Sequence, residues 1–341
     1  MRMRKATRFF SMGWHCAEAM GPKNDCTKTC DRCGQEAVAF IRYSGAHLCR
    51  NHFFEFVEKR VRKDLKRQMA AWKGKKRLRV GVALSGGKDS SATLGILQRL
   101  LSKRMGTDIV AILVDEGIEG YRPRTREAAL DLCQQLGVPL VIGSFEKEFG
   151  LTMDDIATVA REQTPCTYCG VLRRYILNMI ARELGCDVLA TGLNLDDTAQ
   201  SILMNIARGD VERLARLGPH ARVQKGLVPR VQPLRSIPEK ESFLYAYLKG
   251  IRFSHAECPY ADAAVRNKYR KIIFELEDDS PGTRHALLQS YEALRECLAE
   301  RFEPANLRPC KACGEPTVKE VCETCTLVAD VRTRSAPGRK T

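Results

Sequence analysis

The sequence predicts an α/β protein, a parallel sheet covered by helices on both faces, with a small metal-binding module near each end of the chain. Between residues 78 and 209, near-continuous apolar segments alternate with amphipathic helical ones, as in a parallel sheet buried on both faces. A glycine turn, Ser85-Gly-Gly-Lys-Asp-Ser90, follows the first apolar segment. Close cysteine pairs lie toward both termini, and 15 cysteines in a chain expected in the cytoplasm favour metal or sulfur chemistry over disulfides.

The N-terminal part divides into an extension and a zinc module. Residues 1–29 lack a continuous apolar core, so we expect a disordered extension and no signal peptide. The next module spans residues 30–77. Two close pairs in it, Cys30 with Cys33 and Cys49 with His52, supply four ligands for one structural zinc ion.

A basic helix is predicted over residues 52–73 of this module. Apolar residues recur along it at three- and four-residue steps, which indicates one buried face: Val57, Val61, Leu65, Met69 and Trp72. The other face carries basic residues that are either solvated or in contact with phosphates: Lys59, Arg60, Arg62, Lys63, Lys66 and Arg67.

The α/β domain is expected over residues 78–260. Its predicted strands are Arg79–Leu84, Ile109–Val114, Pro139–Gly143 and Asp187–Ala190. The helices predicted among them are Ser90–Lys103, Thr125–Leu136, Gly170–Leu184 and Asp196–Arg208. Ligands of such sheets bind at the carboxyl ends of the strands, where the glycine turn falls.

The C-terminal third is predicted to be helical and to end in a second zinc module. After a loop-rich stretch over residues 209–238, helices are expected at Glu239–Lys249, Ala264–Glu277 and Thr283–Ala299, the later ones forming a segment over residues 261–305. Residues 306–328 contain two Cys-x2-Cys pairs, a four-thiolate zinc knuckle: Cys310, Cys313, Cys322 and Cys325. We expect a disordered tail over residues 329–341.

The glycine turn is suited to bind phosphate. A strand that breaks into glycines and then a helix presents backbone N–H groups at the helix N-terminus, where anions are favoured. Gly86 and Gly87 allow close backbone approach, and Lys88 reaches phosphate oxygens. The spacing differs from the Gly-x4-Gly-Lys-Ser/Thr pattern, so a Walker NTPase is disfavoured.

Charge and hydropathy point to a nucleic-acid partner and away from membranes. The formal net charge of +15 calls for an anionic partner, and nucleic acid is the favoured one. No apolar stretch approaches the ~20 residues that span a bilayer. We therefore expect a cytoplasmic protein without a membrane partner.

A third cysteine set lies inside the α/β domain. Cys166 and Cys169 fall just before a predicted helix, whose N-terminus lowers thiol pKa. Two thiolates cannot close a metal site, and Cys258, in a proline-flanked loop, is the candidate third ligand. Three thiolates suit an iron–sulfur cluster with one iron free of protein ligands, and a persulfide relay between the same cysteines is the alternative. Cys133 and Cys186 are expected in the core.

Several motifs together carry a resemblance to a known family. Ser85–Ser90 resembles the pyrophosphate loop of the N-type ATP pyrophosphatases, which cleave ATP between the α- and β-phosphates. With this loop, the internal cysteine pair, the motif Ala190-Thr-Gly-Leu-Asn-Leu-Asp-Asp197 and both zinc sets, the chain resembles the TtcA/TtuA superfamily of PP-loop tRNA thiolases. It is most similar to the branch of TtuA and the cytosolic wobble-uridine thiolases, from about Cys30 to Cys325.

The resemblance implies an ATP-dependent sulfurtransferase that adenylates the C2 oxygen of a tRNA uridine and replaces it with sulfur. It implies ATP, Mg²⁺, two Zn²⁺ and a [4Fe–4S] cluster as cofactors. The cluster ligands would be Cys166, Cys169 and Cys258. The implied nucleotide site comprises Ser85, Gly86, Gly87, Lys88, Asp89, Ser90, Asp115, Arg173 and Gly192. The implied catalytic residues are Lys88, Asp89, Cys166, Asp197 and Cys258.

The implied partners are tRNA, a homodimeric second copy, and a sulfur donor that is either a ubiquitin-like thiocarboxylate carrier or free sulfide. The modified uridine, at position 34 or 54, is left open. Leu193 stands where the family usually has His, which removes one hydrogen-bonding group from the site. The segment Val231–Arg235 is either a tRNA-positioning motif or plain structure. The rival functions are a PP-loop amidating enzyme and a non-catalytic zinc RNA-binding protein.

Overall fold

The computed structural model describes residues 28–102, 106–160, 163–220, 223–261, 265–302 and 306–335. The chain forms two compact units, with the division between Val57 and Glu58. The first contains the antiparallel hairpin of β1 (Ala39–Ile41) and β2 (Ala46–Leu48), joined by a 3-10 turn at Arg42–Ser44. It also contains the first part of α1 (Arg50–Gln68), which a 3-10 turn at Ala70–Trp72 follows.

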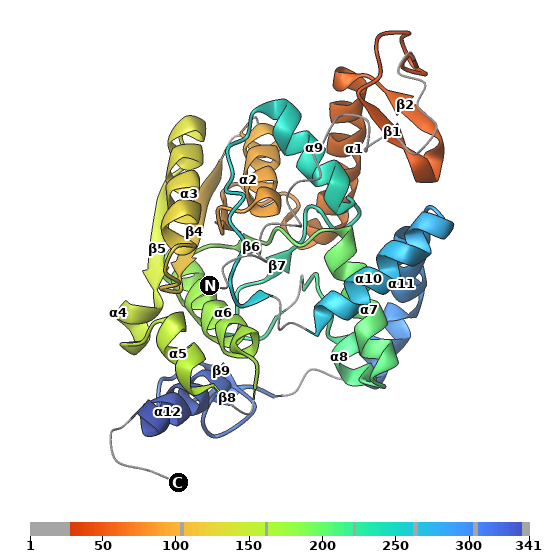
Figure 1. Cartoon of the computed structure of the whole chain (residues 1–341). Coiled ribbons are helices and arrows are strands. Elements are labelled where there is room, and N and C mark those ends of the chain that lie inside the picture. The colour runs from red at the N-terminus through yellow and green to blue at the C-terminus, as the bar shows by residue number, and fades with distance from the viewer. Residues whose placement is uncertain are drawn as a thin grey trace, which may run out of the picture. The chain divides into compact units, whose positions relative to one another are not determined.

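The second unit is built on a five-stranded sheet in the order β5-β4-β3-β6-β7, in which every neighbouring pair is parallel (Figure 1). The strands are β3 (Leu78–Ala83), β4 (Thr107–Asp115), β5 (Leu140–Ser144), β6 (Val188–Ala190) and β7 (Arg230–Val231). The chain order reverses between β5 and β6, on the two sides of β3. Ligands bind at such switch points, outside the carboxyl ends of the strands.

Helices cover both faces of this sheet. The helices of this unit between residues 88 and 301 are α2 (Lys88–Leu101), α3 (Arg122–Leu136), α4 (Phe145–Phe149), α5 (Met153–Val159), α6 (Pro165–Glu183), α7 (Leu195–Ala207), α8 (Val211–Ala215), α9 (Glu239–Lys249), α10 (Arg266–Asp279) and α11 (Thr283–Arg301). Of these, α8, α10 and α11 pack on α7. Ile112 and Val114 of β4 share a buried core with Leu172, Ile176 and Ile180 of α6. Crossovers of this kind are right-handed as a rule, which puts α2 and α3 on the face opposite α6, and α9 packs on α2.

The C-terminal module packs against α6. It consists of β8 (Arg308–Pro309), β9 (Pro316–Thr317) and α12 (Glu323–Ser335). The Tyr168 hydroxyl donates a hydrogen bond to Asp330 of α12 at 3.2 Å, and Arg182 forms an ion pair with Glu315. The module therefore contacts both ends of α6, the helix whose first turns contain the internal cysteine pair.

The predicted fold class is confirmed, and each of the four predicted strands is present with shifts of at most two residues at its ends. Several details differ. The basic helix predicted over residues 52–73 is α1, which ends at Gln68 and is followed by a separate 3-10 turn. Helix α8 lies in the stretch over residues 209–238 that was predicted to be loop. The short strand β7 lies in the stretch predicted to be loop. Helix α6 begins at Pro165, so Cys166 and Cys169 lie in its first turns and not before it. Residues 329–335, expected in a disordered tail, continue α12, where Leu327, Val328 and Val331 are buried.

Two further expectations can be placed against the structure. None of the helices in the described ranges is both long enough and apolar enough to cross a bilayer. The expected N-terminal extension, apart from its last two residues, lies outside the described part of the chain.

Candidate active site and metal centres

The glycine turn between β3 and α2 is a closely packed loop. The Ser90 hydroxyl accepts a hydrogen bond from the Ser85 backbone N–H at 3.1 Å and donates one to the Gly87 carbonyl at 3.0 Å. Gly86 has φ +82°, and a Cβ at this position would lie 2.0 Å from the Thr125 carbonyl oxygen. Because the φ angle is positive and the Thr125 carbonyl leaves no room for a Cβ, only glycine fits at this position.

The turn ends in an open helix N-terminus. Gly87 is the N-cap of α2 and has no side chain to cap the helix, and its own N–H donates a hydrogen bond to the Ser85 hydroxyl at 3.3 Å. The first N–H groups of α2 are thus available to an anion, as the sequence predicts. Gly192 lies against this turn, since a Cβ on it would be 2.8 Å from the backbone N and Cα of Ser90.

Carboxylates from two helices surround Lys88. Its Nζ lies 3.1 Å from Asp89 and 2.7 Å from Glu239, the first residue of α9. Burial alone would lower the pKa of Lys88, but the two carboxylates outweigh it and hold the pKa above its ordinary value. A third carboxylate, that of Asp197 at the start of α7, accepts a hydrogen bond from Arg266 at 3.4 Å.

This carboxylate cluster has the donor set for Mg²⁺. Burial, together with the charges of Asp89 and Glu239, raises the pKa of Asp197 to about 6, although Arg266 acts in the opposite direction. One oxygen of Asp89, Oδ1, is buried and has no hydrogen-bond partner within the described part of the chain. Hard oxygen ligands and an unsatisfied carboxylate oxygen suit a divalent cation that also binds phosphates.

The carboxyl end of β4 supplies a buried ion pair that supports the turn. Arg122 donates a hydrogen bond to the Ser85 carbonyl at 3.1 Å and forms an ion pair with Glu116, and both side chains are buried. Glu116 also lies 3.4 Å from Arg173, a residue of α6 one turn after Cys169. Asp115 ends β4, and its carboxylate accepts from the Gly117 N–H.

The internal cysteines lie along this same edge of the sheet. The Cys166 thiol donates a hydrogen bond to the Tyr260 carbonyl at 3.4 Å, which joins α6 to the segment that carries Cys258. That segment is fixed to the glycine turn, because the Ser254 N–H donates to the Gly86 carbonyl at 2.8 Å. Segments far apart in the chain are thus brought to the phosphate-binding turn.

The environment of Cys169 differs from the expected one. A helix N-terminus lowers thiol pKa, but burial raises the pKa of Cys169, and nearby Cys258 and Cys166 add to the shift against the effect of Arg173. The three sulfurs are not among the described groups whose ligand atoms all lie within 4.8 Å of one another. Three thiols are the number of protein ligands expected for an iron–sulfur cluster with one iron free of protein ligands.

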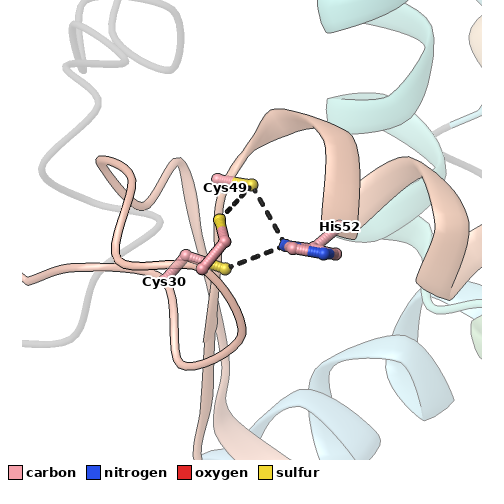
Figure 2. A group of neighbouring side chains, drawn as sticks. Cys30, Cys49 and His52 are labelled. Carbon is pink, nitrogen blue, oxygen red and sulfur yellow. Dashed lines mark hydrogen bonds between the residues drawn. The ribbon is translucent and has the colours of Figure 1, made fainter.

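The N-terminal zinc ligands come together as predicted, within one unit (Figure 2). The sulfurs of Cys33 and Cys49 lie 3.7 Å apart. His52 Nδ1 lies 3.3 Å from the Cys30 sulfur and 3.4 Å from the Cys49 sulfur. Tetrahedral Zn–S bonds of ~2.3 Å place sulfurs ~3.8 Å apart, so the set fits a structural zinc ion.

The C-terminal set has the same geometry. Its four sulfurs lie within 4.8 Å of one another, with 3.6 Å between those of Cys313 and Cys322. Backbone N–H groups of Cys322 and Ala312 donate to the Cys310 sulfur and lower its pKa to about 6. A thiol with a lowered pKa loses its proton more readily, and the thiolate is the form of cysteine that binds zinc.

Other expectations have mixed outcomes. Cys133 and Cys186 are buried, as predicted for core residues. Of the two alternatives for Val231–Arg235, the structure favours plain structure, because the segment is buried and Arg235, which is 1% exposed, binds Glu292 at 2.7 Å. On the basic face of α1, Arg60 is neither solvated nor directed at phosphate, since it forms an ion pair with Glu241 at 2.9 Å.

Glu116, Arg122 and Glu239 were not identified from sequence. Each is a single charged residue without a motif around it, and its partner lies elsewhere in the chain. The only signal was position, since Glu116 directly follows a buried strand and Glu239 opens a predicted helix at the same edge of the sheet.

Comparisons with known proteins agree with this geometry. Residues 57–277 match a family model described as a PP-loop domain, and residues 29–54 match the N-terminal LIM domain of the 2-thiouridine synthetase TtuA. The chain belongs to the PP-loop family of tRNA 2-thiolation proteins. The predicted family is therefore confirmed.

Individual relatives cover almost the whole chain. The tRNA 2-thiolation protein NcsA of Haloferax volcanii is 38% identical over 89% of this chain and 98% of its own length. The tRNA-5-methyluridine(54) 2-sulfurtransferase of Pyrococcus horikoshii is 33% identical over 87% of this chain and 92% of its own. The structure resembles the U34-tRNA thiolase NcsA of Methanococcus maripaludis, solved with its [4Fe–4S] cluster, with a TM-score of 0.77 and 34% identity over 89% of this chain and 96% of that one.

Proposed function

We propose that this protein is an ATP-dependent tRNA sulfurtransferase that replaces the C2 oxygen of a uridine with sulfur. The observation that carries the proposal is the hydrogen bond from the Ser254 N–H to the Gly86 carbonyl, at 2.8 Å, a few residues before Cys258. It ties a thiol-bearing segment to a phosphate-binding turn. The relatives named as tRNA 2-thiolation proteins and sulfurtransferases support the substrate and the reaction.

Activation of the base requires binding of the ATP phosphates. The uracil C2 oxygen is a poor leaving group, and its attack on the α-phosphorus releases pyrophosphate and makes AMP the leaving group. The open N–H groups of α2 and the Lys88 ammonium neutralise charge that grows on the phosphates. Asp89 and Asp197 would hold Mg²⁺, which supplies further charge neutralisation. Arg173 and Asp115 complete the proposed nucleotide site at the end of β4.

Sulfur transfer completes the reaction when a sulfur nucleophile attacks C2 and AMP departs with the original oxygen. Cys166, Cys169 and Cys258 would hold the [4Fe–4S] cluster, which would supply an iron without a protein ligand as a site for the sulfur to be transferred. The protein's own contribution is placement, since α6 and the 251–261 segment are both anchored at the edge where ATP binds. The two zinc sets are proposed as structural sites because four protein ligands leave no open position.

The proposed partners follow from the same chemistry. The net charge of +15 favours tRNA as substrate. The sulfur donor is proposed to be a ubiquitin-like carrier with a C-terminal thiocarboxylate, or free sulfide, and the working unit a homodimer. A cytoplasmic location is proposed in line with the relative from Chlamydomonas reinhardtii named cytoplasmic tRNA 2-thiolation protein 1.

The test is anaerobic reconstitution followed by thiolation of unmodified tRNA with MgATP and sulfide. We expect about four iron and two zinc per chain by counting ligands, and mass spectrometry of nucleosides reports 2-thiouridine and its position. Cys166→Ser should abolish thiolation and leave ATP binding intact. The matched control is Cys297→Ser, at an exposed cysteine of α11.

Three outcomes contradict parts of the proposal. Full thiolation by Cys166→Ser would indicate a PP-loop enzyme that does not use these cysteines. Thiolation without iron would indicate a persulfide relay. Absence of pyrophosphate release when tRNA and ATP are added together would indicate a non-catalytic RNA-binding protein.

A further inference from the structure

Glu239 is a carboxylate on which two cationic side chains from different helices converge. Its Oε1 atom lies 2.7 Å from the Nζ atom of Lys88 on α2. The Arg270 guanidinium of α10 donates hydrogen bonds to both carboxylate oxygens, at 3.1 and 3.0 Å. The Glu239 side chain is only 22% exposed, so water competes weakly for these contacts. The carboxylate therefore lies between the phosphate turn and α10.

The place of Glu239 is fixed through its backbone as well as its side chain. Its N–H donates a hydrogen bond to the Asp196 carboxylate at 2.7 Å, and Asp196 forms an ion pair with Arg284 at 2.9 Å. Both Asp196 and Arg284 are buried. Helix α9, which begins at Glu239, packs on α2, which begins at Lys88. The distance between Glu239 and Lys88 is therefore set by two helices that pack together.

The contacts of Lys88 leave one donor for a ligand. A lysine ammonium carries three N–H donors, and in the described part of the chain its carboxylate partners are Asp89 at 3.1 Å and Glu239 at 2.7 Å. Since Lys88 is the first residue of α2, the remaining donor lies beside the open helix N-terminus, where a phosphate is favoured. A lysine side chain is flexible, so carboxylates that hold it spare the ligand the entropy cost of ordering it.

Of these two carboxylates, Glu239 is the one that can stay with Lys88 when the site fills. Asp89 would hold Mg²⁺ in the proposed reaction, and the metal competes with its contact to Lys88. Glu239 has Arg270 as its second partner, and the positive charge of Arg270 offsets a negative charge that would otherwise repel the phosphates.

Resting on the nucleotide site of the proposed function, we propose that Glu239 is a positioning residue, which orients the Lys88 ammonium so that its third N–H meets a phosphate oxygen of ATP. Glu239 acts through Lys88 and does not itself contact the nucleotide. Arg270 balances its charge. Groups that orient a metal ligand in the same indirect way typically cost about 10- to 100-fold in affinity or activity when they are removed.

The test is a double-mutant cycle in MgATP binding, measured by calorimetry on the full chain carrying its metals, without tRNA. The variants are Glu239→Ala, Lys88→Met and the double variant. We expect Glu239→Ala to bind MgATP about tenfold more weakly. In the Lys88→Met background the same change should cost less than about twofold, because Glu239 then has no ammonium to orient.

Two further readouts separate positioning from a role in folding or in net charge. Glu239→Gln keeps an acceptor oxygen at the same reach, so its MgATP affinity should be within about threefold of that of the parent protein. Adenosine, which has no phosphates, should bind the parent protein and Glu239→Ala equally well. The matched control is Glu275→Ala, which removes an exposed carboxylate from α10 and should leave MgATP affinity unchanged.

Several results would overturn the inference. Unchanged or tighter MgATP binding by Glu239→Ala would mean that the carboxylate repels phosphate and does not orient Lys88. An equal loss with and without Lys88, or a parallel loss of adenosine affinity, would mean that Glu239 only supports the fold of the site. An affinity of Glu239→Gln as low as that of Glu239→Ala would also contradict positioning.

The proposed function is tested separately by nucleoside analysis of tRNA. If the cycle behaves as expected while the parent protein forms no 2-thiouridine, the inference stands and the proposed function fails. A parent protein that binds no MgATP contradicts both.

Discussion

Substitution of Gly86 tests whether the phosphate turn depends on the close contact with α3. In Gly86→Ala, the backbone keeps φ +82°, which costs an L-residue about 1–2 kcal/mol, and the new Cβ meets the Thr125 carbonyl oxygen at 2.0 Å. That oxygen belongs to a helix backbone and cannot rotate away. Overpacking of this kind costs a further ~1–3 kcal/mol, so we expect a total loss of roughly 2–5 kcal/mol of unfolding free energy.

Two control variants separate strain from contact. Gly137→Ala places a side chain at φ +63° with nothing within 4 Å, so it should lose only the ~1–2 kcal/mol of backbone strain. In Gly87→Ala, the nearest atom is the Ser85 hydroxyl oxygen at 3.5 Å, an ordinary contact, and stability should be unchanged.

The assays are urea denaturation for stability and calorimetry for MgATP affinity. Gly86→Ala should also lose at least about tenfold in MgATP affinity, because relief of the contact moves the amide groups that would bind phosphate. Equal stability of Gly86→Ala and Gly137→Ala, or unchanged MgATP affinity in Gly86→Ala, would refute the reasoning.

Three further predictions concern charge, protonation and metal. Glu116→Gln should cost about 3–5 kcal/mol in urea denaturation, because it leaves the buried Arg122 without its carboxylate; a double change of both residues to apolar ones should recover most of the loss. Burial and the charge of Arg60 lower the pKa of His285 to about 4, so the unfolded state binds more protons between pH 4 and about 6.5, and stability falls as pH falls through this range. His285→Gln should remove ~2–3 kcal/mol of this pH dependence when the wild-type and variant denaturation curves are compared, and parallel pH profiles would contradict it. Cys313→Ser should reduce zinc from two to one per chain by elemental analysis and lower the melting temperature, and an unchanged zinc content would contradict the assignment.

The sheet was predictable because its signal is local. In the segment Ile109–Val114 every residue is apolar, so both faces of a strand formed by it must be buried, as in a parallel sheet. This segment lies within β4. β7 has only Arg230 and Val231, too short for a pattern, and its pairing with β6 fixes it as a strand. The start of α6 could have been read from Pro165, a residue favoured at the first position of a helix.

The site was predictable only where residues form motifs. The zinc sets and the glycine turn have spacings that geometry requires, so sequence identifies them. Glu239 and Glu116 act through contacts with residues far away in the chain, and neighbouring residues give no sign of them. The segment that ends at Arg235 could not be assigned from sequence for the same reason, because the carboxylate that pairs with Arg235 belongs to Glu292, 57 residues further along the chain.

The C-terminal zinc module is best understood through the helix on which it packs. Tyr168 lies between Cys166 and Cys169, and its hydroxyl binds Asp330 of α12, while Glu315 of the module binds Arg182 near the other end of α6. A zinc ion that fixes this module therefore also fixes the helix that presents two of the three internal cysteines. Loss of that zinc should weaken whatever the internal cysteines bind before it affects the phosphate turn, because Ser85–Ser90 is held by its own hydrogen bonds and by Arg122. Iron content and ATP affinity, measured together in Cys313→Ser, separate the two effects: iron should fall while ATP affinity stays, and a parallel loss of both would show that the module supports the whole sheet.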